Sequence, residues 1–172
     1  MIRRYCFTVF LVCMATLSAA AEDALPEGIL ELEPYPAPML RLEDIDGAAY
    51  DENDDADTVV FVHFWASWCG PCRKEMPAIQ RMAAVLEPEG LKIAMINTAE
   101  DEDTVFSFLA EYAPELHPLM DRDGQATEAW EPRGLPATYL VDRRGQVRYQ
   151  ALGGRPWDEA AYLNFLRRLL KE

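Results

Sequence analysis

Two cysteines separated by two residues are the groups in this chain best suited to covalent chemistry. Cys69 and Cys72 enclose a Gly-Pro dipeptide. A Cys-x-x-Cys pair can alternate between a dithiol and a disulfide, because one thiolate attacks a disulfide sulfur and the second thiol then resolves the mixed disulfide. Thiol–disulfide exchange is therefore the first hypothesis for the chemistry of this chain.

Three other uses of the same spacing have to be weighed. A zinc site needs about two further ligands, and outside residues 1–21 the only other His or Cys side chains are His63 and His117. Covalent haem attachment requires a histidine directly after the second cysteine, where this chain has Arg73. An inert structural disulfide would close a very small loop and would stabilise the fold only slightly. Each alternative is weaker than the redox interpretation.

A strand and a helix are expected to position the two thiols. Residues 59–65 form an unbroken run of β-branched and aromatic side chains, which is typical of a buried strand. After Cys72, apolar residues recur at helical spacings: Met76, Ile79, Ala83 and Leu86. A helix N-terminus has unpaired N–H groups and partial positive charge, and both would stabilise a thiolate on Cys69. We expect Cys69 to attack, and Cys72, which starts the apolar stripe, to be the more buried resolving thiol.

Three segments, in order along the chain, resemble a known family. Residues 64–72 are FWASWCGPC, residues 73–77 are RKEMP, and residues 134–142 are GLPATYLVD. Together they resemble the thioredoxin superfamily, in particular its exported TlpA/ResA-like thiol–disulfide oxidoreductases, over residues 38–172. The resemblance implies an α/β thioredoxin fold, with helices on both faces of a central mixed β-sheet. It also implies an activity that uses the two thiols with no cofactor and no bound metal.

The resemblance further implies which residues meet a substrate. Pro136 matches the cis-proline that faces the active site in thioredoxin-like proteins, although an X–Pro bond taken alone is cis in only about 5–6% of cases. The alternative is a rigid turn. A cis-Pro136 would leave the backbone of Leu135 free to pair with an extended client segment. Trp68, Gly70 and Pro71 are expected to form a flat rim around the attacking thiol, where client proteins dock.

Two ionisable residues near the cysteines are candidate proton relays. Glu75 lies one helical turn after Cys72, and the resemblance implies that a glutamate here tunes the cysteines. His63 occupies a strand position where thioredoxins carry a buried aspartate and the exported relatives often carry an asparagine. Histidine exchanges protons near neutral pH, so His63 is a candidate to serve Cys72. The competing interpretations are a solvated helix residue for Glu75 and a hydrogen-bonded core residue for His63.

Residues 1–21 are expected to form a signal peptide. Arg3 and Arg4 give a positive start, residues 5–17 are apolar, and small residues end at Ala21, where cleavage is expected. A spanning helix needs about 20 apolar residues, so an uncleaved membrane anchor is the weaker alternative. The protein is therefore expected in the periplasm, or at the outer face of the cytoplasmic membrane if the segment stays uncleaved.

The cysteine content and the charge narrow the choice of partners. Cleavage would remove Cys6 and Cys13, leaving only Cys69 and Cys72. In an oxidising compartment this pair stays reduced only if a partner, expected to be a membrane electron donor, supplies electrons. The chain has a formal charge of −14 and no visible basic patch, which argues against nucleic-acid binding.

One domain is expected over residues 39–172. Residues 22–38, rich in Pro, Glu and Ala, lack periodicity and are expected to be a linker or an extended arm. Residues 39–50 contain an Asp-Gly turn signal, which predicts an N-terminal β-hairpin extension.

Hydrophobic patterns predict the elements that follow the helix after Cys72. They are a strand at 91–96, a helix through Val105 to Tyr112, a strand at 116–120, a helix at 126–130, a hairpin of 137–141 and 147–152, and a helix at 156–171.

The function expected from these observations is the reduction of disulfides in client proteins. The Gly-Pro dipeptide between the cysteines resembles that of reducing thioredoxins, whereas oxidases and isomerases of the superfamily often place histidine there. A disulfide oxidase or isomerase, and a copper or zinc carrier of the same fold, stay open as alternatives. Apocytochrome thiols and a copper-site assembly protein are candidate clients.

Overall fold

The computed structural model describes residues 24–50 and 57–172, so the expected signal peptide at residues 1–21 lies outside the described residues. The elements are β1 (Ile29–Pro36), β2 (Glu43–Asp44), β3 (Val59–Trp65), α2 (Gly70–Leu86), β4 (Leu91–Thr98), α3 (Glu102–Tyr112), β5 (Pro118–Asp121), α4 (Gln125–Trp130), β6 (Ala137–Val141), β7 (Gln146–Leu152) and α5 (Ala160–Leu169). No helix within the described ranges is long and apolar enough to cross a membrane.

The strands form one seven-stranded mixed sheet with the order β1-β7-β6-β3-β4-β5-β2. β3, β4 and β5 are parallel neighbours, whereas the pairs on the β6 side and the β2–β5 pair are antiparallel. β3 lies in the middle, with β4 on one side and β6 on the other. This arrangement confirms the α/β thioredoxin fold expected from the sequence.

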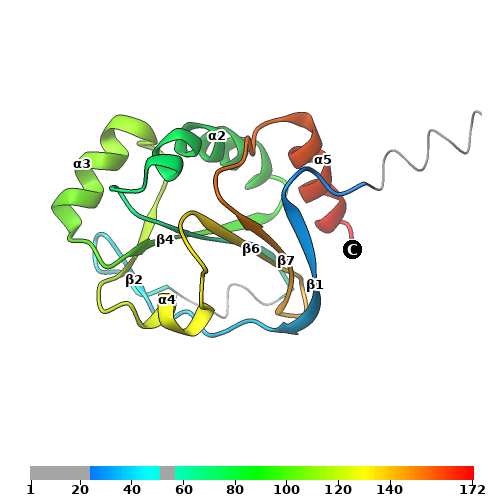
Figure 1. Ribbon diagram of the computed structural model, residues 1–172, viewed down its shortest axis with the longest axis horizontal. Helices are drawn as coiled ribbons and strands as arrows, with labels where there is room; N and C mark the ends of the chain where they lie inside the picture. Colours follow the sequence, from blue (N-terminus) through cyan, green and yellow to red (C-terminus); the bar gives the residue numbers. More distant parts are fainter. Residues whose placement is uncertain (1–23, 51–56) are drawn as a thin grey trace, which may run out of the picture.

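Helices cover both faces of the sheet (Figure 1). α2, α3 and α5 pack on one face, where their apolar side chains form a core with Phe61 and Trp65 of β3. α4 and residues 37–42 cover the other face and enclose Phe64. Side chains alternate between the two faces along a strand. His63 therefore points to the same face as Phe61 and Trp65, toward α2.

The N-terminal region differs from its predicted structure. Residues 29–36, expected to belong to a linker or extended arm, form the edge strand β1, which pairs with β7. Of the two alternatives, these residues keep the extended conformation of an arm, but they pair with the sheet rather than act as a linker.

The predicted hairpin at 39–50 is present in a shortened form, in which Glu43 bridges to Ala49 and Tyr50 N–H donates a hydrogen bond to the Leu42 carbonyl. The two-residue strand β2 also pairs with β5. The turn of the hairpin is held by Asp44, whose side chain accepts hydrogen bonds from the N–H groups of Asp46 and Ala48.

The last helix is shorter than predicted. α5 begins at Ala160, whereas the hydrophobic pattern predicts a start near Pro156. The residues between β7 and α5 form a loop that contacts α2 instead. In this loop the backbone N–H of Arg155 and the indole N–H of Trp157 both donate hydrogen bonds to Glu75.

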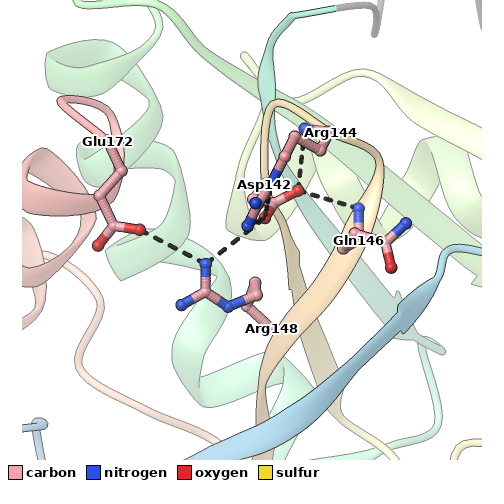
Figure 2. A network of polar contacts seen from close by, with 5 residues as sticks. All are labelled: Asp142, Arg144, Gln146, Arg148 and Glu172. Carbon is pink, nitrogen blue, oxygen red and sulfur yellow. Dashed lines mark hydrogen bonds and ion pairs between the residues drawn. The ribbon is translucent and has the colours of Figure 1, made fainter.

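A polar network closes the turn between β6 and β7 (Figure 2). Asp142 Oδ1 accepts hydrogen bonds from the backbone N–H groups of Arg144 and Gln146. Its Oδ2 lies 3.5 Å from Nη1 of Arg148, which also pairs with Glu172. Burial acts to raise the pKa of Asp142, but the hydrogen bonds from Gln146 and Arg144 outweigh it and hold the pKa below its ordinary value. β6 runs antiparallel to β3, so this turn lies at the end of the sheet opposite the cysteines.

Candidate active site

β3 and α2 bring the two cysteines to the carboxyl end of the central strand. β3 ends at Trp65 and α2 begins at Gly70, with Cys69 as its N-cap residue. Cys69 and Cys72 form a disulfide, and Cys69 Sγ accepts a hydrogen bond from Cys72 N–H at 3.2 Å. Cys72 is 0% exposed and Cys69 is 5% exposed. The expected order of burial is present, but both residues are buried in this oxidised form.

Exposed residues surround the buried disulfide. Trp68 is 69% exposed, whereas Trp65 is fully buried. Gly70 and Pro71, which begin α2, are exposed as well. An exposed indole beside two residues without polar side chains offers a client chain an apolar surface next to the reactive sulfurs. The structure thus brings the three predicted rim residues together.

The Leu135–Pro136 peptide bond is cis, as the sequence resemblance implied. Ala137 of β6 pairs with Phe64 of β3, which places Pro136 at the same end of the sheet as the cysteines. Pro136 is buried, and Leu135 is partly buried against both cores. The Pro136 carbonyl accepts a hydrogen bond from Gly153 N–H at 2.8 Å, so the loop is attached to the end of β7.

Glu75 is buried one helical turn after Cys72, with an exposure of 4%. Its Oε2 accepts hydrogen bonds from the backbone N–H of Arg155 at 2.9 Å and from Nε1 of Trp157 at 3.2 Å. Gly154 lies beside the carboxylate, since a Cβ at that residue would be in ordinary van der Waals contact with Oε2, at 3.7 Å. Burying a carboxylate is costly without such donors, and here they also fix its position. Glu75 is therefore not the solvated helix residue that the sequence left open.

His63 connects Glu75 to the neighbouring strand β6. It is fully buried, and its Nδ1 lies 2.9 Å from Oγ1 of Thr138. Its Nε2 lies 3.4 Å from Oε1 of Glu75, although this approach lacks hydrogen-bond geometry in the oxidised form. Thr138, His63 and Glu75 form a buried row of polar side chains, hydrogen-bonded between Thr138 and His63, that ends one helical turn from Cys72. The carboxyl group and the imidazole in this row are both groups that can accept a proton.

The surroundings of His63 also bear on the zinc alternative. Its two ring nitrogens face Thr138 and Glu75 rather than completing a ligand set with the two sulfurs. Within residues 24–50 and 57–172, no group of three or more His, Cys, Asp or Glu side chains is placed to hold a metal ion.

Several contacts of the site were not predicted from the sequence. Arg155 and Trp157 bind Glu75 across separations of 80 and 82 residues. Glu100, which follows β4, accepts hydrogen bonds from Ser67, two residues before Cys69. No local pattern marks contacts between such distant segments. Only the alternation along β3, which directs His63 toward the helix that carries Glu75, was available as a signal.

Comparison with known proteins agrees with this geometry. The model of the Redoxin family matches residues 21–166. The thiol-disulfide oxidoreductase ResA of Bacillus subtilis (strain 168) is 30% identical over 128 residues, which cover 74% of this chain and 68% of that protein. These matches confirm the resemblance that was inferred from the three sequence segments.

Solved structures extend the comparison to the fold. A protein from Chlorobium tepidum, named as a candidate thiol:disulfide interchange protein DsbE, has a TM-score of 0.70 and 32% identity. The match covers 81% of this chain and 99% of that chain. StoA from Bacillus subtilis has a TM-score of 0.63 at 18% identity, over 79% of this chain and 98% of that chain. At this lower identity the likeness supports the fold alone.

Proposed function

The chain belongs to the Redoxin family and is a thiol–disulfide oxidoreductase, and on that premise we propose that it is exported and reduces disulfides in client proteins. The observation that carries the proposal is the Cys69–Cys72 disulfide at the N-terminus of α2, beside the exposed Trp68. A helix N-terminus favours the thiolate that attacks. The Gly-Pro dipeptide between the cysteines supports reduction as the direction.

The reaction runs in two exchange steps. The Cys69 thiolate attacks one sulfur of the client disulfide, which forms a mixed disulfide and releases the other client sulfur as a thiolate. Cys72 then loses its proton and attacks Cys69 Sγ, which forms the Cys69–Cys72 disulfide and releases the second client thiolate. Both client thiolates take up protons. Two electrons pass from the dithiol to the client, whose disulfide becomes two thiols.

Glu75 and His63 are the groups that move the proton of Cys72. Glu75 shares a helix face with Cys72 because the two residues are three apart. Its carboxylate is fixed by Arg155 and Trp157 and lies beside the imidazole of His63. Cys72 is buried, so an internal acceptor serves its deprotonation better than bulk water does. The carboxylate accepts the proton, and the imidazole, whose Nε2 lies 3.4 Å from Oε1, is a second group that can take it up.

The client is held by two surfaces. Trp68, Gly70 and Pro71 contact it around the attacking sulfur, and the backbone of Leu135 beside cis-Pro136 pairs with an extended client segment. Backbone pairing does not depend on side chains, so it suits an enzyme that acts on a disulfide within different sequences. Each turnover leaves the pair oxidised, and a membrane electron donor restores the dithiol.

Export is supported by the pattern of residues 1–21, with a positive start, an apolar core and a small-residue end at Ala21. The proposed location is the periplasm, or the outer face of the cytoplasmic membrane if the segment is retained. Fractionation of cells that express the full chain tests this point. Recovery of the protein in the cytoplasm with residues 1–21 still attached would overturn it.

Insulin reduction tests the function itself. The protein, supplied with dithiothreitol as the electron source, is expected to accelerate insulin precipitation, whereas Cys69→Ser is expected to be inactive. Metal analysis of untagged protein is run in parallel. Absence of insulin reduction would overturn the proposed function, and stoichiometric copper or zinc that survives mild chelation would replace it with metal carriage.

A further inference from the structure

Glu100 contacts the segment that leads into the redox pair. Its Oε2 accepts a hydrogen bond from Ser67 N–H at 2.7 Å and another from Nδ2 of Asn97 at 2.8 Å. Its Oε1 accepts a hydrogen bond from the Ser67 hydroxyl. Asn97 is fully buried and pairs with Trp65 at the end of β3. One carboxylate therefore connects the end of β4 to the residues that follow β3.

The remaining polar group of Ser67 is also bound. Its carbonyl oxygen accepts a hydrogen bond from Nη2 of Arg73 at 3.2 Å. The Arg73 guanidinium lies over the ring of Tyr112, 5.5 Å from the ring centroid, so α2 and α3 share this anchor. The N–H, hydroxyl and carbonyl of Ser67 are all held, two of them by Glu100.

The position of Ser67 is important because the next residue, Trp68, is packed against few other side chains. Trp68 is 69% exposed, so burial does not fix its orientation. A flexible rim would lose conformational freedom whenever a client docks, and this loss weakens binding. Hydrogen bonds to a charged carboxylate are stronger than those between neutral groups, so Glu100 is suited to remove that freedom in advance.

We propose that Glu100 is a positioning residue that holds Ser67, and through it Trp68 and Cys69, in the conformation that a client protein meets. Glu100 does not take part in the exchange chemistry, and it acts on client docking rather than on the reactivity of the sulfur. The inference deepens the proposed function and rests on it.

The test compares a protein client with a small disulfide. Glu100→Ala removes all three hydrogen bonds, whereas Glu100→Gln keeps an oxygen for Ser67 N–H and an amide that can donate to the Ser67 hydroxyl. Glu128→Ala is the matched control, because Glu128 is exposed on α4 and carries the same charge. Insulin reduction by Glu100→Ala is expected to fall about tenfold, which corresponds to about 1.4 kcal/mol. Glu100→Gln is expected to recover most of the rate.

A small aromatic disulfide such as dithiobis(nitrobenzoate) distinguishes a loss of rim positioning from a general structural defect of the variant. Its rate of reaction with the reduced Cys69 is expected to stay within about twofold of wild type in every variant, since it does not need the rim for docking. Equal losses of rate toward insulin and toward the small disulfide would overturn the proposal, and so would a wild-type insulin rate in a folded Glu100→Ala protein.

If Glu100→Ala fails to fold, the test uses Ser67→Ala, which removes only the hydrogen bond of the hydroxyl. It is then expected to reduce insulin more slowly than wild type, and a wild-type rate would overturn the proposal.

Wild-type insulin reduction shows whether the proposed function itself fails, independently of the role of Glu100. If wild-type protein does not reduce insulin, that function is overturned, and the role of Glu100 is then judged from the emission anisotropy of Trp68. The Trp68 contribution is obtained by difference from Trp68→Phe, since the other tryptophans are buried. Lower anisotropy in Glu100→Ala supports the proposal, and unchanged anisotropy overturns it.

Discussion

His63 Nε2 lies 3.4 Å from Glu75 Oε1, and both side chains are almost completely inaccessible to solvent. One residue comes from the central strand and the other from the helix that begins at the redox pair. Because Thr138 and Trp157 contact the outer atoms of this pair, its position is fixed from both sides. In the proposed mechanism this pair takes the proton from Cys72.

Replacing either member of the pair tests that task. Glu75→Gln keeps an oxygen for Arg155 and Trp157 but cannot exchange a proton, and His63→Asn removes the imidazole. We expect insulin reduction to slow about tenfold or more in Glu75→Gln. The alkylation rate of the reduced protein is measured against pH in both variants. Removing a carboxylate should move the curve of Glu75→Gln to lower pH, because a nearby negative charge opposes thiolate formation.

Glu128→Gln provides the control for the loss of one carboxylate, since Glu128 is exposed on α4. Its alkylation curve and insulin rate are expected to match those of wild type. Alkylation curves that are unchanged in both Glu75→Gln and His63→Asn would remove the proton-relay role from the mechanism.

Trp157→Phe tests whether the donor to Glu75 contributes to function as well as to packing. The ring of Trp157 packs edge-on against Phe61, and Phe can keep much of this contact but not the N–H bond to Oε2. We expect insulin reduction to be slower than in wild type, because the Glu75 carboxylate loses one of the two donors that fix its position. The control is Trp130→Phe, because Trp130 is also buried and its Nε1 has no hydrogen-bond partner among the described residues. Both variants should lose stability, and an equal rate of insulin reduction in both would argue against the role of Trp157.

The mixed disulfide between the two exchange steps can be trapped, which tests the order of the steps. Cys72→Ser leaves the attacking thiol in place but removes the resolving thiol, so a mixed disulfide between Cys69 and the client should accumulate. Non-reducing electrophoresis and mass spectrometry of the adduct provide the measurement. Cys69→Ser should give no adduct. An adduct that forms through Cys72 instead would reverse the assigned roles.

Much of the site was predictable because its signals are local. The run 59–65, the apolar spacing after Cys72 and the Cys-x-x-Cys pair all lie within one strand–helix unit. The environment of Glu75 was not predictable, since its two donors come from the loop that precedes α5. The stretch around Pro156 also fits the start of a helix, which concealed the role of Trp157.

β1 illustrates a second reason for a missed prediction. Ile29–Pro36 is an edge strand with mostly exposed side chains, so backbone pairing with β7, not burial, determines its conformation. Hydrophobic periodicity reports burial and therefore gave no signal here. By contrast, β3 is buried along its whole length. Its boundaries were predicted correctly because hydrophobic patterns report burial.

Asp142 provides a test of stability that is independent of the redox site. Asp142→Asn weakens the network at the β6–β7 turn (Figure 2) and should lower the free energy of unfolding at pH 7 by about 1–3 kcal/mol. The pKa of Asp142 is lowered in the folded protein. Its stabilisation is therefore complete above the unfolded value of about 3.9 and is lost as the pH falls through the lower folded value.

The difference between wild type and Asp142→Asn should accordingly narrow on acidification, as measured by denaturant unfolding at several pH values. Asp46→Asn, an exposed residue with the same change of charge, is the control and should have a smaller effect. A difference that stays constant from pH 7 down to about 3 would contradict this interpretation of the network.

The central claim, that the Cys69–Cys72 pair reduces its clients, is tested most directly by its equilibrium reduction potential. The chain without residues 1–21 is titrated against a defined thiol–disulfide buffer, and about 30 mV corresponds to about 1.4 kcal/mol for this two-electron couple. We expect a value near that of thioredoxin, about −270 mV. A value near about −120 mV, typical of a strong disulfide donor, would contradict it and make the protein an oxidase.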